Sequence, residues 1–443
     1  MQIDPLRTEG LGDSTYLLTH EGIGLVVDAQ RDIDRFLDPM LASGAEFRLV
    51  LETHLHNDYL SGGPELARVA GAELVLPAAA APTYRHRPAF HQEDIDLGAF
   101  VVRPLHTPGH TPEHTSYLIL VENEPVAVFS GGSLLVASAG RSDLLGAERA
   151  EALARLQYQS VHRLADLPDP VGLYPTHGEG SFCTTSEGSG HTSTIGVEKR
   201  SNPILAYPDE ESFIDGELDG LGPWPSYYAH MGPANIRGAP PMPDHEVPVL
   251  LTSAIKDLPS NVAVVDARPR DQYARGHLPG SLAIELGDRF GTWVGWIVPY
   301  QAPLALVIAP DQDLDEALTQ LRRIGFDDVV GVIRDLADPD LDLITHRMVG
   351  IEEFTAAMAD GAQLLDVRNE AERSEGTVPG SIESYVPDLA AATPDGLIAG
   401  REVWVACESG YRASLAASLI EARGFVPVVL NDAGIADVLA VVD

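Results

Sequence analysis

Cysteine, basic residues and long apolar runs are all scarce in this sequence. Its 443 residues contain only two cysteines, Cys183 and Cys407, which excludes a disulfide framework and favours a reducing compartment. Lysine and arginine number 29 against 66 acids, and the net charge of −37 argues against nucleic acid or anionic lipid as a partner. No segment reaches the roughly 18 apolar residues of a membrane span, and the N-terminus lacks a signal-peptide pattern. We therefore expect a cytoplasmic protein.

The chain is long enough for about three domains. Residues 1–180 alternate short apolar strands with polar loops, which is typical of a sheet that carries a site on its loops. Residues 200–247 are rich in proline and glycine and read as a wrapping segment or linker. Periodic spacing predicts a helix over residues 148–164, with one buried face made by Ala152, Leu153, Leu156, Val161 and Leu164.

An internal repeat follows the wrapping segment. The stretch VVDARPRDQYARGHLPGSL at 264–282 matches LLDVRNEAERSEGTVPGSI at 364–382, and each copy continues with a strand, a helix and a Gly-Phe turn. We expect two similar α/β domains, so the predicted boundaries are 1–245, 246–346 and 347–443.

A short loop in the second copy has the character of a nucleophile site. Residues 403–419, VWVACESGYRASLAASL, read as a buried strand, a tight loop and a helix. Backbone N–H groups of Glu408, Ser409, Gly410 and Tyr411 would cradle an anion there, helped by the helix dipole and by Arg412. A cysteine in such a cradle is held as the reactive thiolate, so Cys407 is the predicted nucleophile.

This copy resembles the rhodanese family of sulfurtransferases, through the CxxGxR loop and the upstream LLDVRxxxE and GxxPGSI motifs. The resemblance implies that Cys407 takes a sulfane sulfur as a persulfide and passes it to an acceptor. The first copy has Ile308-Ala309-Pro310 where the loop would start and has no cysteine. We expect residues 246–346 to be a spacer or docking domain.

Histidines and an aspartate follow several predicted strands of the first domain. His54, His56 and Asp58 come from THLHNDYLSGG, His110 from HTPGHTPEH and His177 from LYPTHGEGS. Strand-end loops bring their side chains to one edge of a sheet, and imidazole with carboxylate suits zinc or iron. We predict one metal ion, Fe(II) or Zn(II), and no nucleotide cofactor.

The first domain looks like the metallo-β-lactamase superfamily, whose fold is an αββα sandwich. Taken with the repeat, the nearest kin are persulfide dioxygenases fused to rhodanese domains, through THLHND, HTPGHTPEH, VFSG, GRSDLLG, HGEGSFC and TIGVEKRSN. The resemblance implies that His54, His56 and His110 are first-site ligands. It assigns Asp58 and His177 to the second position of two-metal relatives.

Two positions depart from that family. Tyr59 stands where two-metal relatives have a histidine, and Gly132 stands where the family has a metal-ligating aspartate. Three outcomes follow for the site. Asp58 completes an iron site, the three histidines hold zinc for hydrolysis of a thioester, or the domain binds metal weakly and only docks a substrate.

The remaining residues and partners complete the prediction. His114 either supports the ligands from behind or lies on the loop surface, and we favour the surface role. Arg141 either meets an anionic thiol cosubstrate or forms a structural ion pair. The partners expected from the resemblance are a low-molecular-weight thiol persulfide and thiosulfate or sulfite. We also expect a homo-oligomer.

Overall fold

The computed structural model describes residues 1–185 and 190–442. It divides into two compact units. Unit 1 comprises Met1–Pro243 with Arg322–Gly325, and unit 2 comprises Asp244–Leu321 with Phe326–Asp443. Among the described residues, no helix is long and apolar enough to cross a membrane.

Unit 1 contains two six-stranded sheets. The first has the order β1 (Gln2–Thr8), β2 (Asp13–His20), β3 (Ile23–Val27), β4 (Glu46–Leu51), β5 (Glu73–Pro77), β6 (Arg87–Ala89). The second has the order β14 (Ser193–Thr194), β13 (Gly172–Pro175), β10 (Glu124–Gly131), β9 (Thr115–Val121), β8 (Val101–His106), β7 (Ile95–Asp96). A small hairpin pairs β11 (Leu134–Leu135) with β12 (Ser138–Ala139).

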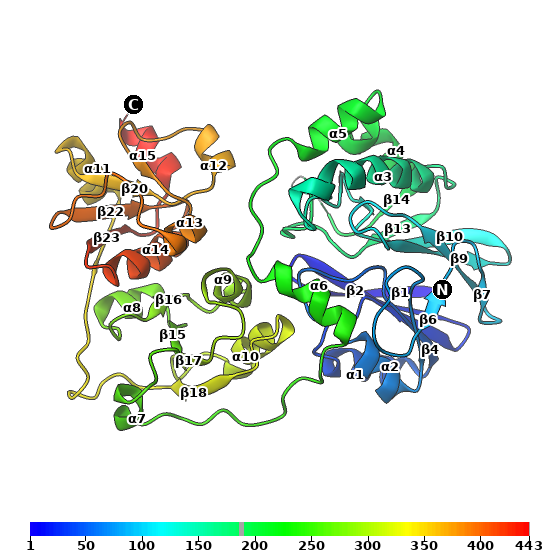
Figure 1. Cartoon of the computed structure of the whole chain (residues 1–443), viewed down its shortest axis with the longest axis horizontal. Helices are drawn as coiled ribbons and strands as arrows, with labels where there is room; N and C mark the ends of the chain where they lie inside the picture. The colour runs from blue at the N-terminus through cyan, green and yellow to red at the C-terminus, as the bar shows by residue number, and fades with distance from the viewer. Residues whose placement is uncertain (186–189, 443) are drawn as a thin grey trace. The chain divides into compact units, whose positions relative to one another are not determined.

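Helices cover the outer face of each sheet (Figure 1). On the first sheet lie α1 (Asp34–Ser43) and α2 (Gly63–Ala70). On the second lie α3 (Ala147–Ala165), α4 (Ile195–Ser201), the 3-10 helix η1 (Pro203–Ala206) and α5 (Glu210–Leu218). A third cluster of buried side chains, including Leu25, Leu51, Ile119 and Phe129, joins the two inner faces. These layers form the predicted αββα sandwich.

The wrapping segment contains more regular structure than its sequence suggested. It holds α5 and also α6 (Tyr228–Arg237), although proline occurs inside α6 at Pro233. Tyr227 and Tyr228 are buried, as expected for aromatic residues that pack on a domain. The periodicity was hidden because one of the three buried positions of α6 is the polar Asn235 and because Pro233 lies inside the helix.

The buried face of α3 differs from the predicted one. Leu153, Val161 and Leu164 are buried, but Ala152 and Leu156 are exposed. The interior position is taken instead by Gln157, which is fully buried. An apolar pattern in the sequence does not reveal a polar residue on the inner face of a helix.

Unit 2 contains two parallel sheets of similar order. The first runs β16 (Leu282–Ala283), β15 (Ala263–Asp266), β17 (Leu304–Val307), β18 (Val329–Ile333). The second runs β21 (Ile382–Glu383), β20 (Gln363–Asp366), β22 (Glu402–Ala406), β23 (Val426–Leu430), β19 (Arg347–Val349). The helices are α7 (Thr252–Lys256), α8 (Arg270–Arg275), α9 (Phe290–Ile297), α10 (Leu314–Arg323), α11 (Ile351–Ala359), α12 (Glu370–Ser374), α13 (Val386–Ala391), α14 (Tyr411–Glu421), α15 (Ile435–Val442).

The repeat makes the same buried contact in both copies. Arg268 pairs with Asp266 at 2.6 Å, and its guanidinium also donates to the carbonyl of Gly276. Arg368 pairs with Asp366 at 2.8 Å and donates to the carbonyl of Gly376. The common Asp-x-Arg pattern thus ties the end of one strand to the following helix in each copy.

Candidate active sites

The five metal-ligand candidates of unit 1 lie together at the ends of strands. His54, His56, Asp58, His110 and His177 are each no more than 1% exposed. The His54 ring lies 4.1 Å from the ring of His56, 4.9 Å from that of His110 and 5.2 Å from that of His177, measured between centroids. Side chains far apart in the sequence therefore meet at one place.

The grouping differs in two respects from the predicted ligand sets: His177 joins His54 and His110, and His56 groups with Asp58 and His177 rather than with His110. Possible ligand atoms of His54, His110 and His177 lie within 4.8 Å of one another, and so do those of His56, Asp58 and His177. His177 thus faces the first position as well as the second. Four histidine rings therefore meet in one space, whereas the sequence alone assigned them to two separate metal positions.

Hydrogen bonds fix which nitrogen of His54 faces the centre. The Thr53 hydroxyl donates to Asp28 at 2.7 Å and lies 2.8 Å from Nδ1 of His54. Because that hydroxyl proton is already used, Nδ1–H of His54 is the donor and Nε2 keeps its lone pair. The Nδ1–H of His110 likewise donates to the carbonyl of Arg141 at 2.8 Å, so its Nε2 is also a lone-pair nitrogen.

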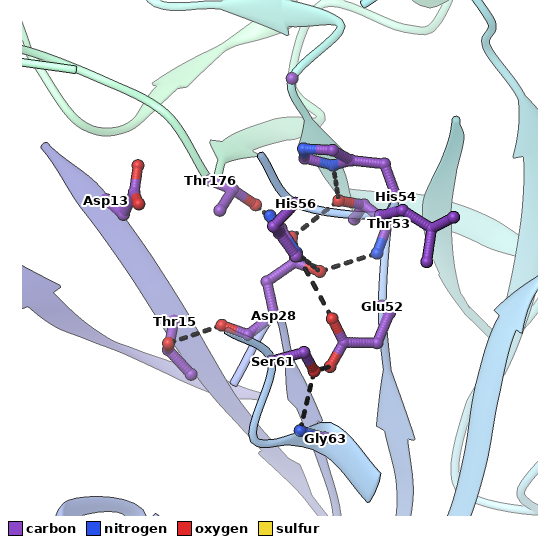
Figure 2. A network of polar contacts seen from close by, with 12 residues as sticks. Asp13, Thr15, Asp28, Glu52, Thr53, His54, His56, Ser61, Gly63 and Thr176 are labelled. Carbon is purple, nitrogen blue, oxygen red and sulfur yellow. Dashed lines mark hydrogen bonds and ion pairs between the residues drawn. The ribbon is translucent and has the colours of Figure 1, made fainter. Parts of the chain in front are cut away.

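Asp28 organises the hydrogen bonds around Thr53 and His56 (Figure 2). It follows β3 with a φ of 56° and accepts hydrogen bonds from the Thr53 backbone and from the Thr53 and Thr176 hydroxyls. Nε2 of His56 lies 3.3 Å from Asp28 and 3.4 Å from Glu52. The Nε2–H of His56 therefore points to carboxylates, which leaves Nδ1 directed elsewhere.

The inward-facing atoms are the ones that a metal ion would satisfy. Within the described chain, Nδ1 of His56, Nε2 of His110 and both carboxylate oxygens of Asp58 are buried and have no hydrogen-bond partner. Nε2 of His177 lies 3.2 Å from Nε2 of His54, while its Nδ1 contacts Asp13 at 2.8 Å. Two lone pairs that face each other require a cation between them, so the donor set fits a metal ion.

The electrostatics of His54 and His110 agree with neutral imidazole ligands, whereas burial lowers the pKa of His56 less than the Asp28 and Glu52 carboxylates raise it. Burial lowers the pKa of His54 and of His110 well below the ordinary value, and neighbouring histidines lower it further. Burial raises the pKa of Asp58 to about 8, and the Asp13 carboxylate adds to that rise. A bound cation would offset this cost, because metal binding favours the ionised carboxylate and the neutral imidazole.

Gly132 has a direct structural consequence for His110. A Cβ atom at residue 132 would lie 2.2 Å from Cδ2 of the His110 ring. The imidazole thus occupies the space into which a side chain at this position would extend. The backbone N–H of Gly132 donates to Nε2 of His114 at 2.9 Å. His114 is therefore a buried support of this loop, and the prediction of a surface role was wrong.

Four residues that support the site were not singled out from the sequence. They hold backbone groups of the ligand loops or the rings themselves, and they are Asp28, Glu52, Gln157 and Asn235. Gln157 accepts from the backbone N–H of His110 and donates to the carbonyls of Ser133 and Gly140. Asp28, an acid directly after an apolar strand, was the one visible signal.

Asn235 connects α6 to the loop that carries His56. Its amide donates to the carbonyls of His56 and Tyr59, each at 2.9 Å, and accepts from the N–H of Ser61 at 2.9 Å. Tyr59 stacks on His56 with ring centroids 4.3 Å apart, and its hydroxyl lies 3.0 Å from Nε2 of His56. Tyr59 thus contacts the imidazole edge opposite Nδ1.

Arg141 is engaged by protein groups. Its guanidinium forms a two-pronged pair with Asp143 at 2.6 and 2.7 Å and also donates to the carbonyl of Gly222. Since the side chain is 4% exposed, the structural ion pair is the alternative that the geometry supports. Cys183 is fully buried, as expected for a packed small side chain.

The candidate nucleophile of unit 2 lies between a strand and a helix. Cys407 directly follows β22 and is 1% exposed. The backbone N–H of Gly410 donates to its Sγ at 3.2 Å. Gly410 precedes α14 with a φ of 87°, a conformation that favours glycine. Of the other predicted cradle residues, Glu408 and Ser409 are exposed, and the side chains of Tyr411 and Arg412 are partly buried.

Arg412 is held by a carboxylate of the same domain. Its two terminal nitrogens each lie 2.5 Å from an oxygen of Glu372. Glu372 belongs to a capping box with Asn369 at the start of α12, so the carboxylate is itself positioned. Burial lowers the pKa of Arg412, but Glu372 and the nearby Cys407 raise it above its ordinary value.

Residues of the first repeat copy border this loop. The Tyr411 hydroxyl donates to the carbonyl of Glu285 at 3.1 Å, and Arg270 reaches Asn431 at 2.9 Å. In the first copy itself, the loop after β17 is filled by Gln312. Its side chain accepts from the N–H of Ala309 at 2.9 Å and donates to the carbonyl of Ala267. The Ala309 N–H of this loop, which has no cysteine, is therefore hydrogen-bonded to a side chain of the same copy.

Two stretches of the chain, one for each candidate site, match known protein families. Residues 9–177 match the metallo-beta-lactamase superfamily, and residues 351–440 match the rhodanese-like domain. A crystal structure of a metallo-beta-lactamase from Staphylococcus aureus subsp. aureus COL superposes with a TM-score of 0.68. It is 28% identical and covers 75% of this chain and 99% of its own.

Two sequence relatives are similar to the N-terminal part. A hydroxyacylglutathione hydrolase-like protein of Homo sapiens is 35% identical over 162 residues, which is 36% of this chain and 52% of that protein. An uncharacterised protein of Mycobacterium tuberculosis is 31% identical over 198 residues, which is 44% of this chain and 77% of that protein. The chain thus spans about half the length of the human relative. It belongs to the metallo-β-lactamase superfamily through its N-terminal domain, and a rhodanese-like domain follows that domain.

Proposed function

We propose that the protein is an enzyme of sulfur metabolism that transfers sulfane sulfur through a persulfide on Cys407. In this proposal it handles low-molecular-weight thiol persulfides, with thiosulfate or sulfite as further substrates. The observation that carries the proposal is the position of Cys407 Sγ, which follows a strand, accepts the Gly410 N–H and lies at the start of α14. A match to the rhodanese-like domain over residues 351–440 supports it.

The transfer has two steps. The Cys407 thiolate attacks the outer sulfur of thiosulfate or of a thiol persulfide, which forms an Sγ–S bond. The S–S bond of the donor breaks, and sulfite or a thiolate leaves with the electron pair. An acceptor such as cyanide, sulfite or a thiolate then attacks the outer sulfur of the enzyme persulfide. The Cys407 thiolate departs with the bonding pair and is ready for another cycle.

The residues around Cys407 have separate tasks in these steps. The Gly410 N–H and the N-terminus of α14 favour negative charge on the sulfur that is attacked or displaced. Arg412 adds a fixed positive charge, and Glu372 holds its guanidinium in one place. Arg270, Glu285 and Trp293 come from residues 246–346 and lie beside the loop. That segment, proposed as a second rhodanese-like domain without a nucleophile, thereby contributes one wall.

For the N-terminal domain we propose a persulfide dioxygenase-like role that Gly132 impairs. His54, His56 and His110 would hold the metal through the lone-pair nitrogens described above, with Asp58 and His177 beside them. A ferrous ion at this site would supply oxygen activation, whereas zinc would supply an acidified water. The chain's own contribution is the burial of these side chains and fixed imidazole tautomers, set by Thr53, Asp28 and the Arg141 carbonyl.

A zinc-dependent thioester hydrolase of the glyoxalase II type is the second candidate. Two observations favour it: the histidine-rich donor set and the 35% identity to a hydroxyacylglutathione hydrolase-like protein. A non-catalytic docking domain is the third. Elemental analysis of the purified protein, combined with oxygen uptake, thioester cleavage and thiosulfate–cyanide exchange, separates the three.

The expected outcomes are distinct. Iron with slow persulfide-dependent oxygen uptake supports the dioxygenase-like role. Zinc with thioester turnover and no oxygen uptake supports the hydrolase. Metal-free protein with full sulfur exchange supports the docking domain. Absence of sulfur exchange in wild-type protein contradicts the rhodanese proposal, whatever the N-terminal domain does.

A further inference from the structure

A second cluster of metal-ligand side chains lies in unit 2, away from Cys407. It consists of His277, His346 and Glu421, whose possible ligand atoms all lie within 4.8 Å of one another. His277 follows α8, His346 precedes β19, and Glu421 is the last residue of α14. The three residues thus come from three separate segments. Neither the proposed sulfur transfer nor the site of the N-terminal domain uses them.

His277 is oriented as a metal-bound histidine would be. Its ring is fully buried and stacks on Tyr273, with centroids 3.7 Å apart and an interplanar angle of 10°. Nδ1 lies 2.8 Å from the carbonyl of Tyr273, which can only accept, so Nδ1 carries a proton. Metal-bound histidines are commonly fixed in this way, by a hydrogen bond from the other ring nitrogen to a backbone carbonyl.

The remaining nitrogen of His277 faces a carboxylate. Nε2 lies 2.6 Å from Oε2 of Glu421. A lone pair opposite a carboxylate oxygen would be repulsive, so a cation must lie between these two atoms. That cation is either a proton, which makes His277 an imidazolium, or a metal ion.

His346 distinguishes between the two. Both of its ring nitrogens are buried and have no hydrogen-bond partner among the described residues. A proton shared by His277 and Glu421 would leave His346 unused, whereas a metal ion would bind one of its nitrogens.

We propose that His277, His346 and Glu421 bind a divalent transition-metal ion of the zinc class. Two imidazoles and one carboxylate are a familiar zinc donor set, with water as a fourth ligand. Ligands about 2.1 Å from zinc in a tetrahedron lie roughly 3.4 Å apart. The cluster therefore needs only a small widening of the contact between His277 and Glu421. His346 and Glu421 are partly exposed, which gives the ion a path of entry.

The ion would join the two repeat copies. His277 belongs to residues 246–346, and Glu421 ends the helix that begins beside Cys407. Binding would fix the far end of α14 to the neighbouring copy. Because an ion that binds only the folded state stabilises it, zinc should raise the unfolding temperature of unit 2.

The test is zinc binding by the full-length protein. Protein stripped with a chelator is titrated with Zn²⁺ in competition with a chromogenic zinc indicator, and the number of equivalents is counted for wild type, His346→Gln and Glu421→Gln. Each variant is expected to bind one equivalent fewer than wild type, while the ions held by the N-terminal domain remain. His162→Gln changes a partly buried histidine of α3 and serves as the control, which should bind as wild type does.

A second measurement guards against misfolding of the variants. Thiosulfate–cyanide exchange depends on Cys407, which lies at the opposite end of α14, so a variant that retains exchange is folded in unit 2. If His346→Gln and Glu421→Gln are folded and bind as many equivalents as wild type with unchanged affinity, the site does not exist. The pair His277–Glu421 would then be an ordinary protonated ion pair.

Discussion

The guanidinium of Arg412 and the carboxylate of Glu372 meet through two contacts of 2.5 Å, beside the nucleophile candidate Cys407. Burial raises the pKa of Glu372, but Arg412 outweighs that effect and the resulting pKa is lowered. The pair is thus ionised at neutral pH. Its geometry fixes the Arg412 cation, which interacts with Cys407.

Replacing Glu372 should therefore reduce sulfur transfer. Glu372→Gln keeps the shape of the side chain but removes its charge, so the Arg412 guanidinium loses its fixed position. We expect kcat/KM for thiosulfate–cyanide exchange to fall roughly tenfold, which corresponds to about 1.4 kcal/mol. Glu370→Gln, at an exposed position of the same helix, is the matched control and should be silent. Equal activity of the two variants would contradict a positioning role for Glu372.

Cys407→Ser should abolish thiosulfate–cyanide exchange. A hydroxyl is not ionised at neutral pH and cannot form the persulfide, so the loss should exceed roughly a thousandfold. Cys183→Ser is the natural comparison, since Cys183 is buried in unit 1 and burial raises its pKa well above the ordinary value. That variant should retain exchange. Thiosulfate–cyanide exchange that persists in Cys407→Ser would show that Cys407 is not the nucleophile.

Gly132→Asp tests whether a missing carboxylate limits the metal site. Any side chain at this position must displace the His110 ring, which should cost about 1 to 3 kcal/mol of unfolding free energy. We expect the aspartate to raise affinity for Fe²⁺ by at least roughly tenfold and to increase persulfide-dependent oxygen uptake. Gly132→Ala introduces the same displacement without the charge. Equal iron binding by the two variants would mean that the carboxylate is not what the site lacks.

Asn235→Ala should loosen the loop that carries His56. The variant removes hydrogen bonds to the carbonyls of His56 and Tyr59 and from the N–H of Ser61, all of which are buried. We expect a loss of about 2 to 4 kcal/mol in unfolding free energy and a roughly 10- to 100-fold loss in metal affinity. His230→Ala changes an exposed residue of the same helix and should alter neither quantity. Chemical denaturation and metal titration measure the two effects.

Glu217 should make the stability of unit 1 depend on pH. Burial raises the pKa of this carboxyl to about 8, from 4.5 in the unfolded chain, and the Ser142 hydroxyl only partly opposes the rise. The folded state therefore binds the proton more tightly. This contribution to stability is complete below pH 4.5 and is lost as the pH rises to about 8.

The size of that loss should be about 5 kcal/mol, since the folded and unfolded pKa values differ by about 3.5 and one pKa unit corresponds to about 1.4 kcal/mol. Glu217→Gln cannot ionise and should reduce the pH dependence of the urea midpoint between pH 5 and about 8, a range in which Asp58 and Asp13 also titrate. Asp215→Asn alters an exposed acid of the same helix and should leave the dependence as it is in wild type. If the pH dependence of Glu217→Gln equals that of wild type, Glu217 does not contribute to it.

The sequence by itself determined the architecture and the chemistry-bearing residues. Apolar strands that end in His54, His110 and His177 predicted one convergent edge, because strand ends of a sheet lie together, and the rings do meet. The repeat predicted two similar α/β domains, and the structure has one parallel sheet in each copy, with a similar strand order. The Cys407 loop was visible because strand, glycine and helix start are local features.

Only the tertiary structure decided how those residues are held. His177 faces both groups of ligands, Gln157 enters the core beneath His110, and Asn235 reaches the ligand loop from a segment that looked irregular. The position of the His110 ring beside Gly132 is likewise a contact that only the tertiary structure decided. Such contacts join residues distant in sequence through single polar atoms. Periodicity reports which side of an element is apolar, and it carries no information about the partner that a buried polar group will meet.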